Sequence, residues 1–467
     1  MASTPSLTLL LALVLPLIPL AVAAPEKHLV THLPGFDGAL PSKHYAGYIT
    51  VDEHNGRGVV PSTLSVEALP EGCPSCTSIP IVGQSMIYLD SPAGVGMSYS
   101  LNKSDYTTGD LKTAADAHTF LLKWFELYPE FQSNPFYISG ESYAGIYIPT
   151  LADEVVKGGF CHSHCACEVV CVSLQSEVNV CIQGYLIGNG VTDLDYDLNS
   201  FVPFAHGMGL ISTDLFEDVS AACHGTFWGK VNDVCQEKID RVRWELKDLN
   251  TYNILAPCYH HPEVQETAFV NSSLPSSFRK LGETERPFPV RKRMAGLSWP
   301  LGLPVSSGHV TLWPELGGRS LPCTSDELAT IWLDDEDVRA VIHAKPKSLI
   351  GSWELNTARI DYTHDTGSMV EYHKKFTATG YRVLIYSGDH DLCIPFTGTE
   401  AWVRSLGYRV VDSWRPWHFG GQVAGYTQGY DHNLTFLTIK GSGHTVPEYK
   451  PKESLAFYTH WLFGEKI

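Results

Sequence analysis

The fold of this chain is decided by one stretch, Phe136-Tyr137-Ile138-Ser139-Gly140-Glu141-Ser142-Tyr143-Ala144-Gly145. Its first three residues are apolar and typical of a β-strand, and the apolar segment 144–156 is compatible with a helix. A serine on a sharp turn between a strand and a helix is a nucleophile elbow, and Gly140 and Ala144 must be small because the backbone doubles back there. The helix that follows directs its positive dipole end towards a developing oxyanion. We therefore predict that Ser142 is a nucleophile and that the backbone amide of Tyr143 is an oxyanion donor.

Length and composition bound the fold and the partners. The chain has 467 residues, of which 44% are hydrophobic, which is enough for one large domain with an insertion or for two domains. The formal net charge of −18 argues against nucleic acid and against an anionic membrane as partners.

The first 23 residues indicate export. An apolar core at 7–20 precedes the small-residue site Ala21-Val22-Ala23, which is typical of a secretory signal, although no Lys or Arg comes before the core. No later apolar run is long enough to span a membrane, so we expect no membrane association after signal removal. Export makes the 12 cysteines candidates for disulfides. Three sequons predict glycosylation, at Asn102, Asn271 and Asn433.

Strands and helices alternate along most of the chain, which indicates an α/β sheet. The predicted helix covers 111–128, and the predicted strands besides the elbow strand are 45–51, 86–90, 183–188, 382–387 and 434–440. Between 58 and 85 neither a helical nor a strand period is present.

A second interruption, residues 158–182, contains five cysteines and two histidines. A zinc site is one interpretation, but the ligand spacing fits no standard site and export disfavours it. We expect no metal and no cofactor.

The block 195–341 has helical periodicity and long loops, and we interpret it as a cap inserted into a core of residues 24–194 and 342–467. Within it, the Pro- and basic-rich tract 286–319 is predicted to be exposed and open to proteolysis.

Two further strands end in candidate catalytic groups. Asp391 follows the strand 382–387, and His444 follows the strand 434–440. Functional groups collect beyond the carboxyl ends of strands in an open α/β sheet, and the chain order Ser142, Asp391, His444 is that of the α/β-hydrolase fold. His444 would take the proton of Ser142, and Asp391 would hold the imidazole tautomer. Asp389 is a rival for that role, and spacing alone does not separate the two aspartates.

Residues 140–145 and 444–451 resemble the serine and histidine signatures of the plant serine carboxypeptidases, peptidase family S10, and most of all those of the cereal type I branch. The likeness covers 33–57, 86–157 and 183–467. It implies an α/β-hydrolase fold with a mostly parallel sheet, release of C-terminal residues from peptides, a vacuolar or secreted location, and Asp391 as the acid of the triad.

The resemblance also implies roles for residues around the triad. Glu141 would bind the terminal carboxylate of the substrate, which needs one shared proton and therefore favours acid pH. Disulfides would join Cys223 to Cys235 and Cys258 to Cys323, and excision of 286–319 would leave two linked chains. Peptides are the expected partners. The oligomeric state is not predicted, and a homodimer is one of the states considered.

One departure from the family is large. The family carries an Asn-Gly-Gly-Pro-Gly-Cys-Ser-Ser segment before the strand 86–90, whose backbone supplies one oxyanion donor and whose Asn helps Glu141, and this chain lacks it. Asn356 stands where the disulfide partner of its cysteine is expected. Residues 72–85 are compatible with a one-nucleotide frame shift, and 158–182 resemble a translated intron. We interpret these features as an aberrant transcript or gene model, with a genuine variant as the alternative, and expect poor turnover.

Two other functions remain open. Relatives of the family use the same triad to transfer acyl groups from glucose esters, so an acyltransferase is the first alternative. A secreted glycoprotein without turnover is the second, and the missing segment favours it. Assays of peptides against a glucose ester donor would separate the enzymatic alternatives.

Overall fold

The computed structural model describes residues 26–36, 38–40, 42–65, 85–158, 180, 182–258, 327–355 and 357–467. Several predictions fall outside these residues: the signal 1–23, most of the Cys-rich stretch 158–182, the tract 286–319, Asn271, Cys323 and Asn356.

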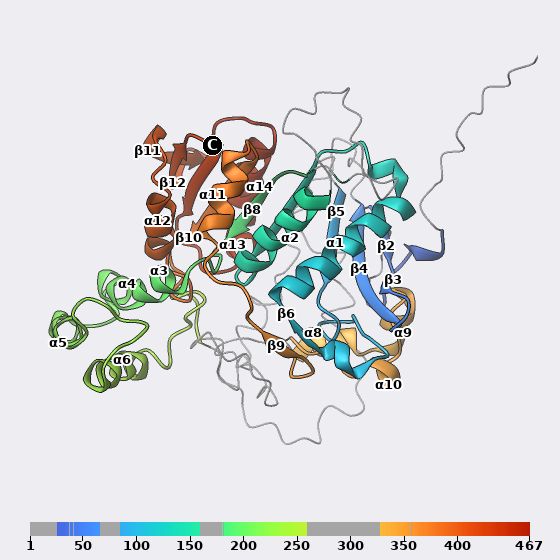
Figure 1. Ribbon diagram of the computed structural model, residues 1–467, viewed down its shortest axis with the longest axis horizontal. Coiled ribbons are helices and arrows are strands. Elements are labelled where there is room, and N and C mark those ends of the chain that lie inside the picture. The colour runs from blue at the N-terminus through green and yellow to red at the C-terminus, as the bar shows by residue number, and fades with distance from the viewer. Residues whose placement is uncertain are drawn as a thin grey trace, which may run out of the picture.

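In the described part of the chain, the central sheet has six strands in the order β11-β12-β13-β10-β8-β7. The strands β7 (Phe136–Glu141), β8 (Ile182–Gly188), β10 (Arg382–Gly388) and β13 (Leu434–Ile439) run parallel, and the hairpin β11 (Val410–Phe419) and β12 (Gln422–Tyr430) is antiparallel. The mostly parallel sheet with flanking helices confirms the predicted α/β class (Figure 1).

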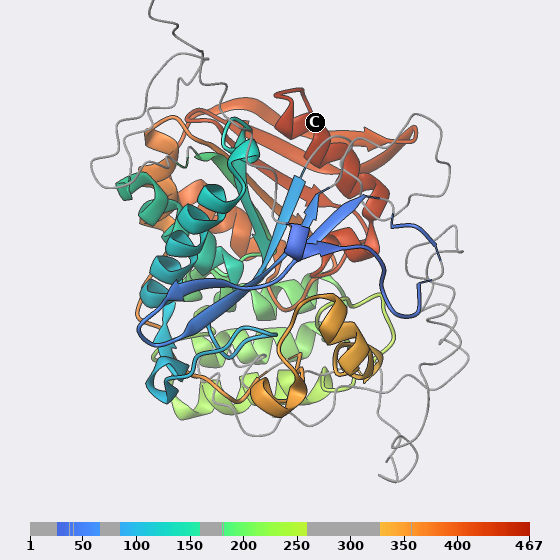
Figure 2. The same cartoon turned by 90° about the vertical axis from the view of Figure 1, so that its right-hand side faces the viewer.

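Side chains on the two faces of the central sheet pack into two separate hydrophobic clusters. Tyr185 and Ile187 of β8 pack in one cluster with residues of α1 (Asp110–Leu127), α2 (Ala144–Gly158), α11 (Val370–Ala378) and α12 (Phe396–Ser405). Leu186, between them, packs in the other cluster with residues of α13 (Val446–Tyr449) and α14 (Pro451–Leu462). Successive strand residues point to opposite faces of the sheet, so the two clusters lie on opposite faces. Helices therefore cover both faces (Figure 2).

A second, antiparallel sheet precedes the central one. It contains β1 (Leu29–Val30), β2 (Lys43–Ala46), β4 (Arg57–Ser65) and β3 (Ile49–Asp52) in that order, and β5 (Ser85–Asp90) also pairs with β4. The predicted single strand 45–51 is wrong, because Gly47 adopts φ +151° and separates β2 from β3.

The stretch 58–85 shows no strand period and no strand was predicted there, yet β4 occupies its first part. Hydrogen bonds to β2, β3 and β5 hold β4 in the sheet, so this strand forms without an alternation of apolar and polar residues. The hairpin β11–β12 was not predicted, although its turn residues Gly420 and Gly421 both have positive φ, as a two-residue turn of type I′ requires. A short parallel pair, β6 (Thr107–Gly109) with β9 (Asp361–Thr363), was missed as well.

Four helices follow β8 within the described residues 189–258: α3 (Leu194–Asn199), α4 (Phe201–Gly207), α5 (Thr213–Cys223) and α6 (Asp233–Glu245). The last three share a core cluster of their own and lie together beyond the sheet in Figure 1. A disulfide joins Cys223 to Cys235, with their Cα atoms 4.7 Å apart. The helices α8 (Glu327–Leu333), α9 (Glu336–Val341) and α10 (Lys347–Ile350) lie apart from that group, and Trp332 Nε1 donates to Pro34 O. The limits of the inserted cap stay a prediction.

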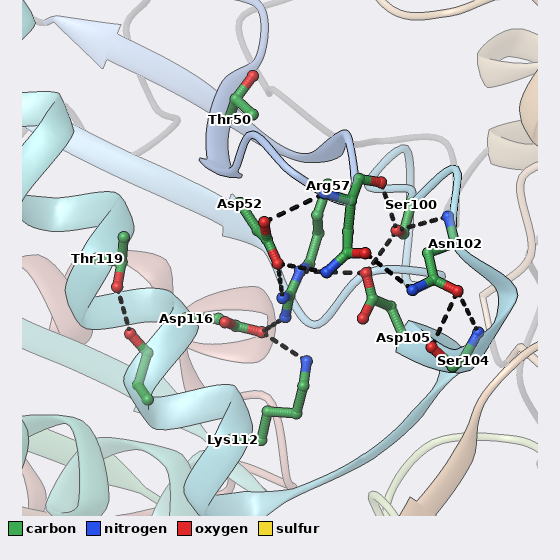
Figure 3. Close-up of polar contacts among 12 residues, drawn as sticks. Thr50, Asp52, Arg57, Ser100, Asn102, Ser104, Asp105, Lys112, Asp116 and Thr119 are labelled. Carbon is green, nitrogen blue, oxygen red and sulfur yellow. Dashed lines mark hydrogen bonds and ion pairs between the residues drawn. The ribbon is translucent and has the colours of Figure 1, made fainter.

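The N-terminal strands are tied to α1 by what we call the Arg57 cluster. The guanidinium of Arg57, a buried side chain, pairs with Asp52 at 2.8 Å, Asp116 at 2.5 Å and Asp105 at 3.4 Å (Figure 3). Asp52 ends β3, Asp105 lies in the 3₁₀ helix η2 (Lys103–Tyr106), and Asp116 lies on α1.

Within the described residues, no helix combines the length and the apolar character needed to span a membrane.

Candidate active site

Ser142 occupies the turn between β7, which ends at Glu141, and α2, which begins at Ala144. Its φ of 62° is in the left-handed region, where a residue with a side chain is strained. The turn is held by Ser142 N, which donates to Gly188 O, and by Val191 N, which donates to Ser142 O, both at 3.0 Å. A Cβ on Gly140 would lie 2.6 Å from Ala144 Cβ, which explains why both positions carry small residues.

The structure brings Asp391 and His444 together. His444 Nδ1 lies 2.7 Å from Asp391 Oδ2, and both side chains are buried. The rival aspartate faces elsewhere: Asp389 Oδ1 accepts from Gly441 N at 2.7 Å and contacts His390 Nδ1 at 2.5 Å. The geometry therefore favours Asp391 as the partner of His444.

The remaining nitrogen of the imidazole is the one a nucleophile would use. His444 Nε2 is buried and has no hydrogen-bond partner among the described residues. Ser142 Oγ is therefore not hydrogen-bonded to it in this structure. Burial opposes the charged imidazole, but the Asp391 carboxylate and its hydrogen bond outweigh burial and raise the pKa of His444. A base whose pKa is raised, with a free buried nitrogen, is suited to accept a proton.

Glu141, the last residue of β7, interacts electrostatically with His444 and with Thr445, the residue after it. Burial raises the pKa of Glu141 to about 7, and the charges of Asp391 and Glu448 act in the same direction. Below neutral pH this carboxyl group therefore keeps its proton and acts as a hydrogen-bond donor.

Sequence reasoning missed Asn189, which is fully buried. Its Nδ2 donates to Asp391 Oδ2 at 2.8 Å, its Oδ1 accepts from Gly388 N at 3.1 Å, and its backbone N donates to Tyr386 O. These bonds hold Asp391 in place from the neighbouring strand. Asn189 follows β8 directly, so the strand-end rule that selected Asp391 and His444 was a signal for it too.

Sequence reasoning also missed the segment Thr251–Ile254, which we call the strap. Thr251 O accepts from Leu392 N and Cys393 N, at 2.9 and 3.1 Å, and Tyr252 O accepts from His444 N at 2.6 Å. The strap therefore bonds to both loops that carry the Asp–His pair. Nothing in its sequence indicates this contact.

The other predicted site residues lie away from the triad or outside the described residues. Asn433 is exposed, and Asn102 Nδ2 donates to Asn55 Oδ1 at 2.9 Å. Cys258 is in a disulfide. Among the residues that the structure describes, no group of three or more His, Cys, Asp or Glu side chains is arranged to hold a metal ion.

A serine on a strand–helix turn, followed along the chain by an aspartate and a histidine that meet beyond two neighbouring strands, places the chain among the α/β-hydrolases. A solved prohormone-processing carboxypeptidase from Saccharomyces cerevisiae has the same fold: the TM-score is 0.59 at 16% identity, over 94% of this chain and 95% of that one.

The sequence comparisons are more specific than the fold. The family model for serine carboxypeptidases, peptidase S10, matches residues 83–464. "Serine carboxypeptidase 1" of Hordeum vulgare is 52% identical over 95% of this chain and 94% of that protein. "Serine carboxypeptidase-like 20" of Arabidopsis thaliana is 50% identical over 95% of each. The chain belongs to the serine carboxypeptidase family, and its fold and family are those of a hydrolase.

Proposed function

We propose that this chain is a serine-type carboxypeptidase that releases C-terminal residues from peptides through an acyl-enzyme. The observation that carries the proposal is the buried Asp391–His444 pair: its Nε2 has no hydrogen-bond partner among the described residues, and the charge of His444 acts on Glu141, the residue before Ser142. The names of the plant relatives support a carboxypeptidase or a carboxypeptidase-like activity.

In the proposed mechanism, Ser142 Oγ attacks the last peptide carbonyl while His444 Nε2 takes its proton. The amide of Tyr143 binds the oxyanion, and the protonated His444 then gives the proton to the leaving amine. Water releases the acyl group by the same route. Asp391 stabilises the imidazolium, and the protonated Glu141 donates to the terminal carboxylate of the substrate.

We also propose that turnover of this chain is impaired, because Tyr143 supplies the one oxyanion donor that we identify. Losing one donor costs on the order of 10²–10³ in kcat.

The proposed setting is the secretory pathway, with export to the vacuole or the exterior, glycosylation at the sequons and peptides as partners.

The first test is covalent labelling of the nucleophile. A fluorophosphonate should modify Ser142 of the purified protein and leave Ser142→Ala unmodified, as read by peptide mass spectrometry. Modification of a different serine in the parent protein would contradict the assignment. Hydrolysis of a blocked dipeptide, compared with acyl transfer from a glucose ester, then separates the carboxypeptidase from the acyltransferase.

A further inference from the structure

Tyr143 is held by a buried carboxylate that the triad does not use. Asp110, the first residue of α1, has an exposed fraction of 0%. The hydroxyl of Tyr143 donates to Asp110 Oδ1 at 2.9 Å. The residue next to the nucleophile is thus joined to the start of another helix.

All four acceptor positions of the Asp110 carboxylate are filled by neutral donors. Oδ1 also accepts from the hydroxyl of Tyr362 at 2.9 Å, and Oδ2 accepts from Thr366 N at 3.2 Å and Thr366 Oγ1 at 2.8 Å. A buried carboxylate is costly unless hydrogen bonds satisfy it, so these donors keep a fixed arrangement around it.

The direction of the hydrogen bonds at Tyr143 follows from its chemistry. Burial, and next the Asp110 carboxylate, raise the pKa of Tyr143, so the phenol keeps its single proton and donates it to the carboxylate. His364 Nδ1 contacts the same phenol oxygen and must therefore be the donor in that contact. Burial lowers the pKa of His364, which favours the neutral ring. The phenol oxygen thus accepts from one side and donates to the other.

The ring of Tyr143 is held as firmly as its hydroxyl. It packs edge-on against Tyr147, Tyr362 and His364, at centroid distances of 4.9, 6.2 and 5.2 Å. With both the ring and the hydroxyl fixed, little freedom is left for the peptide plane at the start of the residue. The amide nitrogen of that plane makes no hydrogen bond to a described residue, which leaves it available to a ligand.

We propose that Asp110 is a positioning residue for the oxyanion site: by holding the Tyr143 hydroxyl it fixes the direction of the Tyr143 amide N–H beside Ser142. The inference rests on the proposed function, since it assumes that Ser142 is the group that reacts. The competing explanation is that Asp110 only joins α1 to the segment 361–366 and contributes stability.

The test compares Asp110→Asn, Tyr143→Phe and the double variant with a control, Asp116→Asn. Asp116 lies on the same helix but bonds to Arg57 and Lys112 in the Arg57 cluster (Figure 3). Two quantities are measured for each protein: the second-order rate of Ser142 modification by a fluorophosphonate, whose phosphoryl oxygen takes the oxyanion position, and the thermal midpoint.

We expect each single variant at the Asp110–Tyr143 bond to slow modification about tenfold, since a misplacement near 1 Å can cost up to 10²-fold. The double variant should be no slower than the slower single variant, because both remove the same bond. Asp116→Asn should lower the midpoint and leave the rate of the folded protein unchanged.

An unchanged modification rate in Asp110→Asn, with a lowered midpoint, would reduce Asp110 to a structural residue. Losses that multiply in the double variant would also overturn the inference, because the two groups would then act independently. The proposed function fails in a different way: Ser142 of the parent protein would not be modified at all, which overturns both.

Discussion

Glu141 lies directly before Ser142, and burial raises its pKa to about 7. A carboxylate at this place would repel the terminal carboxylate of a peptide, whereas the protonated group donates a hydrogen bond to it. Since the acid form is present below its pKa, we predict that KM for a blocked dipeptide rises as the pH passes upward through about 7. A hydrogen bond to a charged group contributes about 1.5–3 kcal/mol, so the rise should be about 10- to 100-fold.

The matched variant for this prediction is Glu141→Gln, which keeps a donor at every pH. Its KM should stay level across neutral pH while kcat still follows the titration of the base. A C-terminally amidated peptide should show no such rise with either protein. The idea fails if the KM of Glu141→Gln follows pH as the parent's does.

At the scale of elements, the strap Thr251–Ile254 holds the loops of Asp391 and His444 in one arrangement. Gly443 lets it approach: a Cβ there would lie 2.2 Å from Tyr252 O and 2.4 Å from Asn253 Cβ. We predict that Gly443→Ala displaces the strap, slows fluorophosphonate modification of Ser142 about 10²-fold and destabilises the fold by about 1–3 kcal/mol.

Gly207→Ala is the control for that variant, because nothing lies within 4 Å of a Cβ at Gly207, in α4. It should keep both the modification rate and the urea midpoint of the parent protein. If Gly443→Ala behaves like Gly207→Ala, the strap has no part in holding the histidine loop.

The elements that sequence reasoning located are those with a strong local period. The strands before Ser142, Asp391 and His444 are rich in apolar residues and lie a few residues at most before these groups, so β7, β10 and β13 were predicted together with their functional groups. Asn189 obeys the same rule and was missed because an asparagine has no catalytic role of its own to search for. The strap could not be predicted, because it makes backbone hydrogen bonds to Leu392, Cys393 and His444. These residues lie roughly 140 to 190 positions further along the chain, and no local pattern encodes such distant contacts.

At the scale of the molecule, two sheets share one core without a described strand between them. Among the described residues, β5 pairs only with β4, and β7 pairs only with β8. Ile87 and Leu89 of β5 nevertheless pack against the same cluster as Phe136 and Ile138 of β7. The second side of β7 is therefore the place from which another segment would reach the elbow, because β8 occupies the first.

This arrangement indicates where the family segment would lie if it were inserted into this chain. A second oxyanion donor must lie within hydrogen-bond reach of a carbonyl attached to Ser142, and β7 leads directly to that serine. A backbone N–H presented along the side of β7 that no described strand occupies would meet this requirement. We therefore expect that an inserted Asn-Gly-Gly-Pro-Gly-Cys-Ser-Ser segment, with its flanking family residues, would pair there.

The last prediction is that restoring this segment before β5 raises kcat by about 10²–10³, the usual contribution of one oxyanion donor. KM should fall as well, because the Asn of the segment would join Glu141 at the terminal carboxylate of the substrate. The measurement is hydrolysis of a blocked dipeptide in mild acid, with hydrogen exchange of the β7 amides as a readout of pairing. The control carries a Gly-Ser insertion of equal length, which adds chain without the donor. A kcat/KM equal to that of the unrestored chain would mean that another loop already supplies the second donor.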